Sequence, residues 1–243
     1  MPEGPSIVLL KEETLRFEGK KVLAANGNAK IDMSRLEGQK IIAIQTWGKH
    51  FLICFKGFTV RIHLLMFGTY RIDDKKEQAP RLSLVFKSGE VNFYTCAIKI
   101  LEGPVDDHYD WSVDVMNADW DAAAARKKVR GQGKKLICDV LLEQDIFSGV
   151  GNIIKNEVLY RVRIHPESIA AKIPPPKLKK LVDEASNYSF EFLDWKRDFV
   201  LKKHWLIHTK KECKRCGLPA IKKYTGVKKR RSFFCTNCQK LYR

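Results

Sequence analysis

Four cysteines near the carboxyl end constrain the fold of this chain more than any other feature of its sequence. They form two Cys-x2-Cys pairs, and 18 residues separate one pair from the other. This is the spacing of a four-cysteine zinc ribbon, in which each pair brings two thiolates together on a tight turn. Two such turns complete a tetrahedron around Zn²⁺ and leave no open coordination position. We therefore expect one structural zinc ion, bound by Cys213, Cys216, Cys235 and Cys238.

The alternative interpretation of these cysteines, as two disulfides, depends on the cellular compartment. The amino terminus has neither the basic stretch nor the long apolar run of a signal peptide. Nor does any segment approach the roughly 18 uninterrupted apolar residues that a membrane span needs. We therefore expect a soluble intracellular protein, cytoplasmic or nucleoid-associated and without a membrane partner, where disulfides are rare. Three further cysteines stand alone and are expected to be buried small hydrophobes: Cys54, Cys96 and Cys138.

The charge balance of the chain is strongly basic. Its 45 Lys and Arg residues outnumber 28 Asp and Glu residues, which gives a formal charge of +17. Such a charge favours polyanionic partners, most often nucleic acid, although a membrane-surface or ribosome-associated protein would carry a similar charge. Many of the cations lie between the two cysteine pairs, where a hairpin tip would reach a phosphate backbone or simply form a solvated loop. These residues are Lys222, Lys223, Lys228, Lys229, Arg230 and Arg231, followed by Phe233 and Phe234.

The amino-terminal half of the chain has β-type periodicity. Short apolar runs separated by Gly- or Asp-containing turns fill residues 20–101, and this pattern favours a sandwich or a barrel. A helix over residues 6–17, with Ser6 as its possible N-cap, is expected before them. The clearest strand candidates are residues 40–44, 51–55, 59–62, 82–86 and 91–94.

From about residue 117 to 199 the apolar spacing becomes helical. Asp119 or Asp121 can cap a helix over residues 122–129, and a later helix covers residues 152–160. Three consecutive prolines end one element and start another at about residue 178. These patterns predict an α+β multidomain fold with a β-sandwich domain, a helical domain and a zinc ribbon, at residues 1–112, 113–203 and 204–243.

The opening residues Pro2-Glu3-Gly4-Pro5 predict neither a helix start nor a strand. Removal of Met1 would leave Pro2 with a free secondary amine. An α-amino group has a pKa of about 8, so much of it is neutral near physiological pH. A neutral amine beside a carboxylate, here that of Glu3, can attack a carbonyl-like carbon and form a Schiff base.

Four separated motifs, in the right order, give the whole chain a family resemblance. They are Pro2-Glu3-Gly4-Pro5, Gly48-Lys49, the segment Leu141 to Asn152 and the four-cysteine ribbon. From Met1 to Tyr242 the chain resembles the formamidopyrimidine-DNA glycosylase and endonuclease VIII family. The resemblance implies a helix–two-turn–helix motif in the helical domain, and a monomer that acts on double-stranded DNA with a damaged base or an abasic site.

The resemblance also implies a bifunctional enzyme, a DNA glycosylase with abasic-site lyase activity. Pro2 would attack the sugar C1′ as the base leaves, and β- and δ-elimination would then cut the strand. Glu3 would move protons during base release. Lys49 matches a β-hairpin lysine that contacts phosphate and assists catalysis; without the resemblance it would be an ordinary surface lysine.

The remaining site residues carried over by the resemblance contact DNA. Gly149, Gly151 and Asn152 match the turn and helix start that bind a phosphate, where Asn152 alone would otherwise suggest a helix N-cap. Arg230 matches the zinc-finger arginine, with Arg231 as the adjacent candidate. Met66, with Leu65 and Phe67 beside it, matches a wedge that fills the gap left by an extruded base. Leu64 is expected to belong to the core.

Three departures from the family pattern bear on the substrate. Ser6 stands where many members have a second glutamate, which keeps open a non-catalytic or lyase-only relative that binds damaged or abasic DNA. Residues 96–100 lack an Arg-Arg-Phe-type loop, and residues 160–205 are short for a lesion-capping loop. The latter two favour the endonuclease VIII branch and oxidised pyrimidines over 8-oxoguanine. The charge and the ribbon alone would also suit an RNA-binding or ribosome-associated protein.

Overall fold

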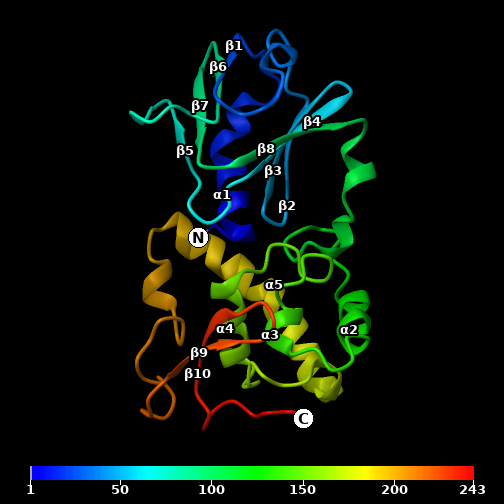
Figure 1. The fold of residues 1–243 in the computed structure, drawn as a ribbon, viewed down its shortest axis with the longest axis vertical. Coiled ribbons are helices and arrows are strands. Elements are labelled where there is room, and N and C mark those ends of the chain that lie inside the picture. Colours follow the sequence, from blue (N-terminus) through cyan, green and yellow to red (C-terminus); the bar gives the residue numbers. More distant parts are fainter. Residues whose placement is uncertain (1) are drawn as a thin grey trace. The chain divides into compact units, whose positions relative to one another are not determined.

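The computed structural model describes residues 2–243, so that Met1, on which the Pro2 hypothesis depends, lies outside the described residues. The chain divides into two compact units, Met1–Asp110 and Trp111–Arg243 (Figure 1). Each unit has its own hydrophobic core. The finer division at residues 112 and 203 remains a prediction. Within residues 2–243, no helix is both long and apolar enough to cross a membrane.

The first unit opens with the helix expected over residues 6–17, which begins two residues earlier than predicted. Helix α1 spans Gly4–Thr14, with Glu3 as its N-cap and Pro5 in its first turn. The expectations that Ser6 caps the helix and that Pro2-Glu3-Gly4-Pro5 starts no element are both wrong. A proline fits the first turn because its missing N–H would have no intrahelical partner there. Ser6 is consequently buried inside the helix, and a 3-10 turn, Leu15–Phe17, follows.

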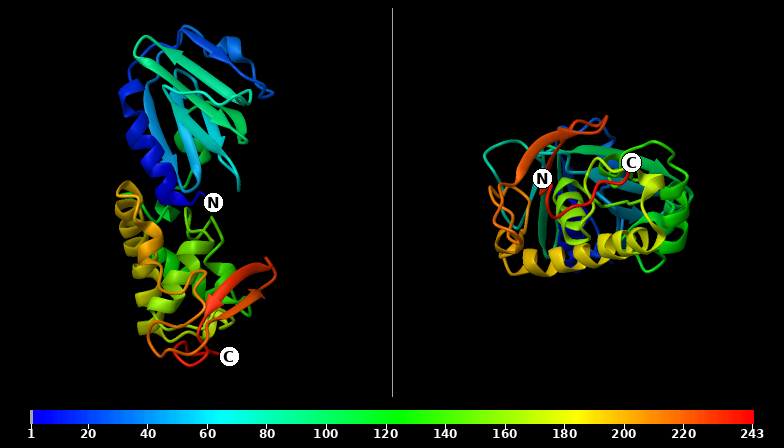
Figure 2. Two further views of the ribbon diagram at one scale, coloured as in Figure 1. Left: turned by 90° about the vertical axis from the view of Figure 1, so that its left-hand side faces the viewer. Right: turned by 90° about the horizontal axis from the view of Figure 1, so that it is seen from below.

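Eight strands form two four-stranded antiparallel sheets, which confirms the sandwich (Figure 2). Their orders are β1-β6-β7-β5 and β2-β3-β4-β8. Alternate residues such as Phe51 and Ile53 enter one core, as the period of two requires. The strand expected at residues 40–44 lies three residues later, and β1, β5 and β8 were not among the individual strand candidates. The strands are Ala24–Asn26 (β1), Ala43–Trp47 (β2), His50–Phe55 (β3), Phe58–His63 (β4), Thr69–Ile72 (β5), Leu82–Phe86 (β6), Gly89–Tyr94 (β7) and Ala97–Glu102 (β8).

The second unit contains the helical segment and the cysteine-bearing hairpin. Helix α2 begins at Ala122 because Asp121, the second of the two candidates, accepts hydrogen bonds from the N–H groups of Ala123 and Ala124. The last helix is longer than predicted and starts within the three prolines. The helices are Ala122–Arg130 (α2), Ile137–Val140 (α3), Asn152–Arg161 (α4) and Pro175–Arg197 (α5).

The hairpin joins β9, Ile221–Thr225, to β10, Arg230–Phe234. Arg230 pairs with Thr225, so the turn between the strands holds residues 226–229. β10 contacts α4, and Figure 1 shows the hairpin lying beside that helix. A small cluster, Tyr160, Ile207, Cys213, Phe233 and Cys235, fills the space beneath the hairpin.

Candidate functional site

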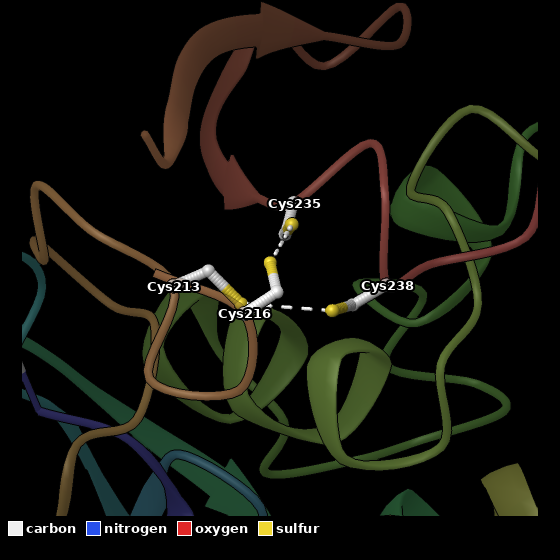
Figure 3. Close-up of side chains that lie close together, drawn as sticks. All are labelled: Cys213, Cys216, Cys235 and Cys238. Atoms are coloured by element: carbon white, nitrogen blue, oxygen red, sulfur yellow. Dashed lines mark hydrogen bonds between the residues drawn. The ribbon is translucent and has the colours of Figure 1, made fainter. Parts of the chain in front are cut away.

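The four predicted ligand cysteines come together as expected. Their sulfur atoms all lie within 4.8 Å of one another (Figure 3). Cys213 Sγ is 3.8 Å from Cys238 Sγ, and Cys216 Sγ is 3.6 Å from Cys235 Sγ. A tetrahedral zinc with Zn–S bonds of about 2.3 Å separates its sulfurs by about 3.8 Å. Both of these separations match that value, and the donor set therefore fits a metal ion of this kind.

Helix α4 supports the cysteine cluster from one side. The Tyr160 hydroxyl lies 3.2 Å from Cys213 Sγ, and the Arg215 guanidinium donates to the Tyr160 carbonyl at 2.7 Å. The buried Gln239 side chain accepts from the Cys235 N–H at 2.9 Å and donates to the Ile164 carbonyl at 2.8 Å. Both cysteine turns are thus tied to the end of α4, and a bound metal would fix the base of the hairpin to it.

Strand β10 is held against the beginning of α4 by three polar side chains. The Asn152 and Asn156 amides donate to the Arg231 carbonyl at 2.9 and 3.3 Å. The Lys155 ammonium, which is fully buried, donates to Ser232 Oγ at 2.8 Å. The backbone of the basic strand is therefore docked on the first turns of the helix.

The start of α4 depends on the glycines that the sequence singled out. Gly149 has a φ of +94°, which disfavours any side chain. Gly151, and not Asn152, is the N-cap, so Asn152 is the first helical residue. The positive end of the helix dipole lies there, beside the basic strand. The role of these three residues as DNA contacts remains a prediction.

Arg230 and Arg231 point to opposite faces of β10, since successive side chains of a strand alternate. The Ser232 side chain meets Lys155 of α4 and Thr225 of β9. Arg230 shares the face of β10 that carries Ser232. Arg231 is exposed on the other face, where its guanidinium lies 5.8 Å from the centre of the Tyr224 ring.

The turn of the hairpin is bound by a buried carboxylate that sequence reasoning missed. Asp139, in α3, accepts hydrogen bonds from the N–H groups of Val227 and Lys228 at 2.9 and 3.1 Å. Gly226 lies so close that a Cβ would come within 2.4 Å of three side-chain atoms of Asp139. The only sequence signal was an Asp inside an apolar run.

A second buried carboxylate, also missed, ties the segment before the ribbon to α4. Glu157 accepts from the N–H groups of Leu206, Ile207 and His208, at distances of 2.7 to 2.9 Å. Burial raises the pKa of Glu157, and the three N–H donors oppose this rise. The path of the chain into the ribbon is therefore fixed by the same helix.

In the first unit, the Pro2 and Glu3 candidates lie at the start of α1. Glu3 is fully buried and Pro2 is half-buried. Helix α1 contacts β2 and β3, the strands joined by the Gly48–Lys49 turn. Gly48 has a φ of +53°, as such a two-residue turn requires. The three candidate catalytic residues thus come from two elements that contact each other.

An aromatic cluster holds the strands on both sides of Lys49. Trp47 and His50 face each other across the hairpin, and their ring centres lie 5.1 and 5.8 Å from that of Tyr109. The Trp47 indole donates to the Asp110 carbonyl at 2.8 Å. Burial, followed by the nearby Arg61, His63 and Lys49, lowers the pKa of His50 to about 3. His50 is therefore neutral, and Lys49 is the cation of the turn.

The wedge candidates form an exposed apolar loop between β4 and β5. Leu65, Met66 and Phe67 are 48%, 49% and 76% exposed, whereas Leu64 is buried, as expected. The Gly68 N–H donates to the Leu64 carbonyl at 2.7 Å. A Cβ at Gly68 would lie 2.0 Å from that oxygen, so the loop requires a glycine there. Insertion of these side chains into DNA remains a prediction.

Comparison with known proteins gives two family matches and several relatives. Residues 1–97 match the formamidopyrimidine-DNA glycosylase N-terminal domain, and residues 112–189 match the formamidopyrimidine-DNA glycosylase H2TH domain. Endonuclease 8-like 3 of Xenopus laevis is 27% identical over 94% of this chain. The match covers 39% of the length of that protein. Endonuclease 8-like 2 of Mus musculus is 33% identical over 68% of the chain and 50% of its own length.

Two bacterial proteins match from end to end. The formamidopyrimidine-DNA glycosylase of Lactobacillus helveticus is 27% identical, with both chains covered completely. The Lactococcus lactis formamidopyrimidine-DNA glycosylase, in a structure with DNA containing an abasic site, superposes with a TM-score of 0.85 at 23% identity, over 98% of this chain and 99% of that one. The two family models together match well over half of the sequence. The chain therefore belongs to the formamidopyrimidine-DNA glycosylase and endonuclease VIII family.

Proposed function

We propose that this chain is a bifunctional DNA glycosylase and abasic-site lyase that acts on double-stranded DNA carrying an oxidised base. The observation that carries the proposal is the placement of Pro2 directly before a fully buried Glu3 at the start of α1. A proline amine beside a carboxylate suits Schiff-base chemistry at a sugar C1′. Relatives that the chain matches from end to end are named for DNA glycosylase activity.

The reaction begins when the neutral Pro2 amine attacks C1′. An N–C1′ bond forms, the bond from C1′ to the base breaks, and the base leaves with a proton. Glu3 is the group that moves this proton and the one lost by the amine. The C1′–O4′ bond then breaks as O4′ takes a proton, which opens the sugar and leaves an iminium ion. Loss of a C2′ proton to a base breaks the C3′–O bond and expels the 3′ phosphate. A second elimination expels the 5′ phosphate, while Lys49 binds the backbone.

DNA binding is assigned to the second unit and to the exposed loop of the first. Arg230 is the finger arginine of this proposal, because it shares a face of β10 with Ser232, which meets Lys155 of α4, whereas Arg231 is exposed beside the Tyr224 ring. Asn152 holds β10 through the Arg231 carbonyl, and the helix start beside it receives a phosphate. A bound Zn²⁺ would be structural, since four thiolates leave no open position. Met66, Leu65 and Phe67 occupy the gap left by the extruded base.

Oxidised pyrimidines are the proposed substrates, and the protein acts as a monomer. The departures at residues 96–100 and 160–205 support this choice. Ser6 favours a second candidate, a lyase that cleaves abasic DNA but excises bases poorly. It is buried in the first turn of α1, three residues after Glu3, where it adds no second carboxylate.

Borohydride trapping on duplex DNA tests the proposal. Wild-type protein should be captured covalently on duplexes containing thymine glycol or an abasic site, and mass analysis should place the cross-link on an N-terminal Pro2. Pro2→Ala should lose trapping and keep DNA binding. Trapping on the abasic duplex alone would favour the lyase. Trapping by Pro2→Ala at the wild-type rate would contradict the choice of nucleophile.

A further inference from the structure

Helix α5 ends in a turn whose hydrogen bonds define a Schellman motif. The Val200 N–H donates to the Trp195 carbonyl at 2.9 Å, and the Phe199 N–H donates to the Lys196 carbonyl at 3.2 Å. Phe199 has a φ of +58°, which is the left-handed conformation that this motif requires. Glycine is the usual residue at this position because a Cβ is disfavoured there.

Phenylalanine at this position helps neither the backbone nor the packing. Its side chain is 95% exposed, more than any other large hydrophobic residue among residues 2–243. The equivalent position after α4 holds Arg163, also at a positive φ, where a charged side chain is suited to solvent. Within the described residues, neither the backbone nor the packing accounts for a large apolar group at this position.

The exposed Asp198 precedes Phe199, whereas the segment after it is basic and is fixed to the end of α5. Lys202 and Lys203 lie in this segment and are both exposed. The His204 ring stacks on Trp195, with ring centres 4.3 Å apart and an angle of 3° between the planes. This stack and the bond from the Lys203 N–H to the Val200 carbonyl, at 2.8 Å, fix the segment to the end of α5.

We propose that Phe199 stacks on an unpaired nucleobase while Lys202 and Lys203 contact the adjoining phosphates. An aromatic face beside flexible cations is how proteins bind unpaired bases, because every base offers a π-face and every nucleotide a phosphate. The Schellman turn fixes the backbone of Phe199, so only its side chain has to be ordered on binding. The proposal rests on the proposed DNA-binding function and adds a base contact to it.

Phe199→Gly is a sharp test because it should leave the fold intact. Glycine is better suited to the left-handed turn, so Tm should stay at the wild-type value or rise. Affinity for a duplex with one thymine glycol, measured by fluorescence anisotropy, should fall about tenfold, the loss expected for one stacked base. Phe199→Trp should keep the affinity. Phe190→Ala, which removes a half-exposed aromatic ring elsewhere on α5, should not change it.

Two duplexes distinguish which base Phe199 stacks on. If Phe199 stacks on the extruded base, Phe199→Gly should weaken binding to the thymine glycol duplex but not to one with a tetrahydrofuran abasic analogue. If it stacks on the base left opposite or beside the gap, both duplexes should bind more weakly. Equal affinity of wild type and Phe199→Gly for both duplexes would overturn the proposal. Failure of the wild type itself to bind either duplex would instead overturn the proposed function.

The salt dependence separates the aromatic contact from the cationic ones. Replacing Lys202 and Lys203 together by Ala should reduce the slope of log K against log [salt] by about 1 to 2, because fewer counterions are released. Phe199→Gly should leave the slope unchanged, since stacking releases none. A lower slope in Phe199→Gly would mean that the segment had moved, and would contradict the fixed backbone of this turn.

Discussion

Asp139 offers a direct way to loosen the basic hairpin without touching its cations or its cysteines. The substitution Asp139→Asn keeps the size of the side chain but removes its charge. The carboxylate now accepts from two backbone N–H groups of the turn, one with each oxygen. An asparagine can accept only one of them and must turn its own NH2 group towards the other.

The expected cost follows from this count of hydrogen bonds. A bond to a charged group contributes about 1.5–3 kcal/mol, and a buried donor left unsatisfied costs about 1–3 kcal/mol. Asp139 is only 3% exposed, so water replaces the lost acceptor poorly. We expect Asp139→Asn to lower the free energy of unfolding of the second unit by about 2–3 kcal/mol, equivalent to a fall in Tm of about 6–12 °C.

Scanning calorimetry measures the expected loss of stability, and a zinc assay checks that the metal site is unchanged. The transition of the second unit should move to lower temperature, while the zinc content stays that of the wild type because the cysteines are unchanged. Glu143→Gln is the matched control: its carboxylate, 28% exposed, pairs with Lys228 at 3.2 Å and should contribute less than about 1 kcal/mol. An unchanged Tm in Asp139→Asn would refute the view that this carboxylate holds the turn.

Three further predictions concern other parts of the chain. The pKa of His50 is lowered to about 3 in the folded state and is about 6.5 in the unfolded chain, so the unfolded state binds a proton first as the pH falls. The stability that the neutral His50 provides is therefore complete above about pH 6.5, and about 2 kcal/mol of it is lost at about pH 5. In denaturant titrations at these two pH values, His50→Phe should lose correspondingly less stability than the wild type. Gly68→Ala should distort the apolar loop, since its Cβ would meet the Leu64 carbonyl at 2.0 Å, and should weaken binding to an abasic duplex by about tenfold or more while α1 and the cysteine site stay intact by circular dichroism and zinc content. Removal of the metal by a chelator, or Cys235→Ser, should release the base of the hairpin and reduce DNA affinity, and readdition of Zn²⁺ should restore it in the wild type but not in the variant.

The sequence predicted those features whose physical cause is local. The spacing of the cysteines alone predicted the cluster. Asp121 could be predicted as a candidate cap of α2 because a cap and its helix are neighbours in the chain. The start of α1 was predicted two residues late, because Pro2-Glu3-Gly4-Pro5 was expected to start no helix, although the first turn of a helix accepts proline. The separation of Arg230 from Arg231 needed the register of β10, which the sequence did not provide.

The buried charges of the second unit could not have been predicted, because their partners are distant in the sequence. Asp139 meets a turn 88 residues away, Lys155 meets Ser232 across 77 residues, and Glu157 binds a segment about 50 residues further along. From the sequence, each of these residues suggests solvent exposure. Burial without a partner would be prohibitively costly, so the partners become evident once the burial is known.

Together these contacts show why the basic hairpin needs more than a metal ion. The cysteines lie before β9 and after β10, so a bound metal fixes only the base of the hairpin. Asp139 holds the turn at the other end, and Lys155 and Asn156 hold the middle of β10 on α4. The Arg230 backbone lies between the turn and the middle, and is therefore fixed on both sides. A strand held in this way loses little backbone freedom when a phosphate binds, whereas a hairpin anchored at its base alone would have to be ordered by the DNA.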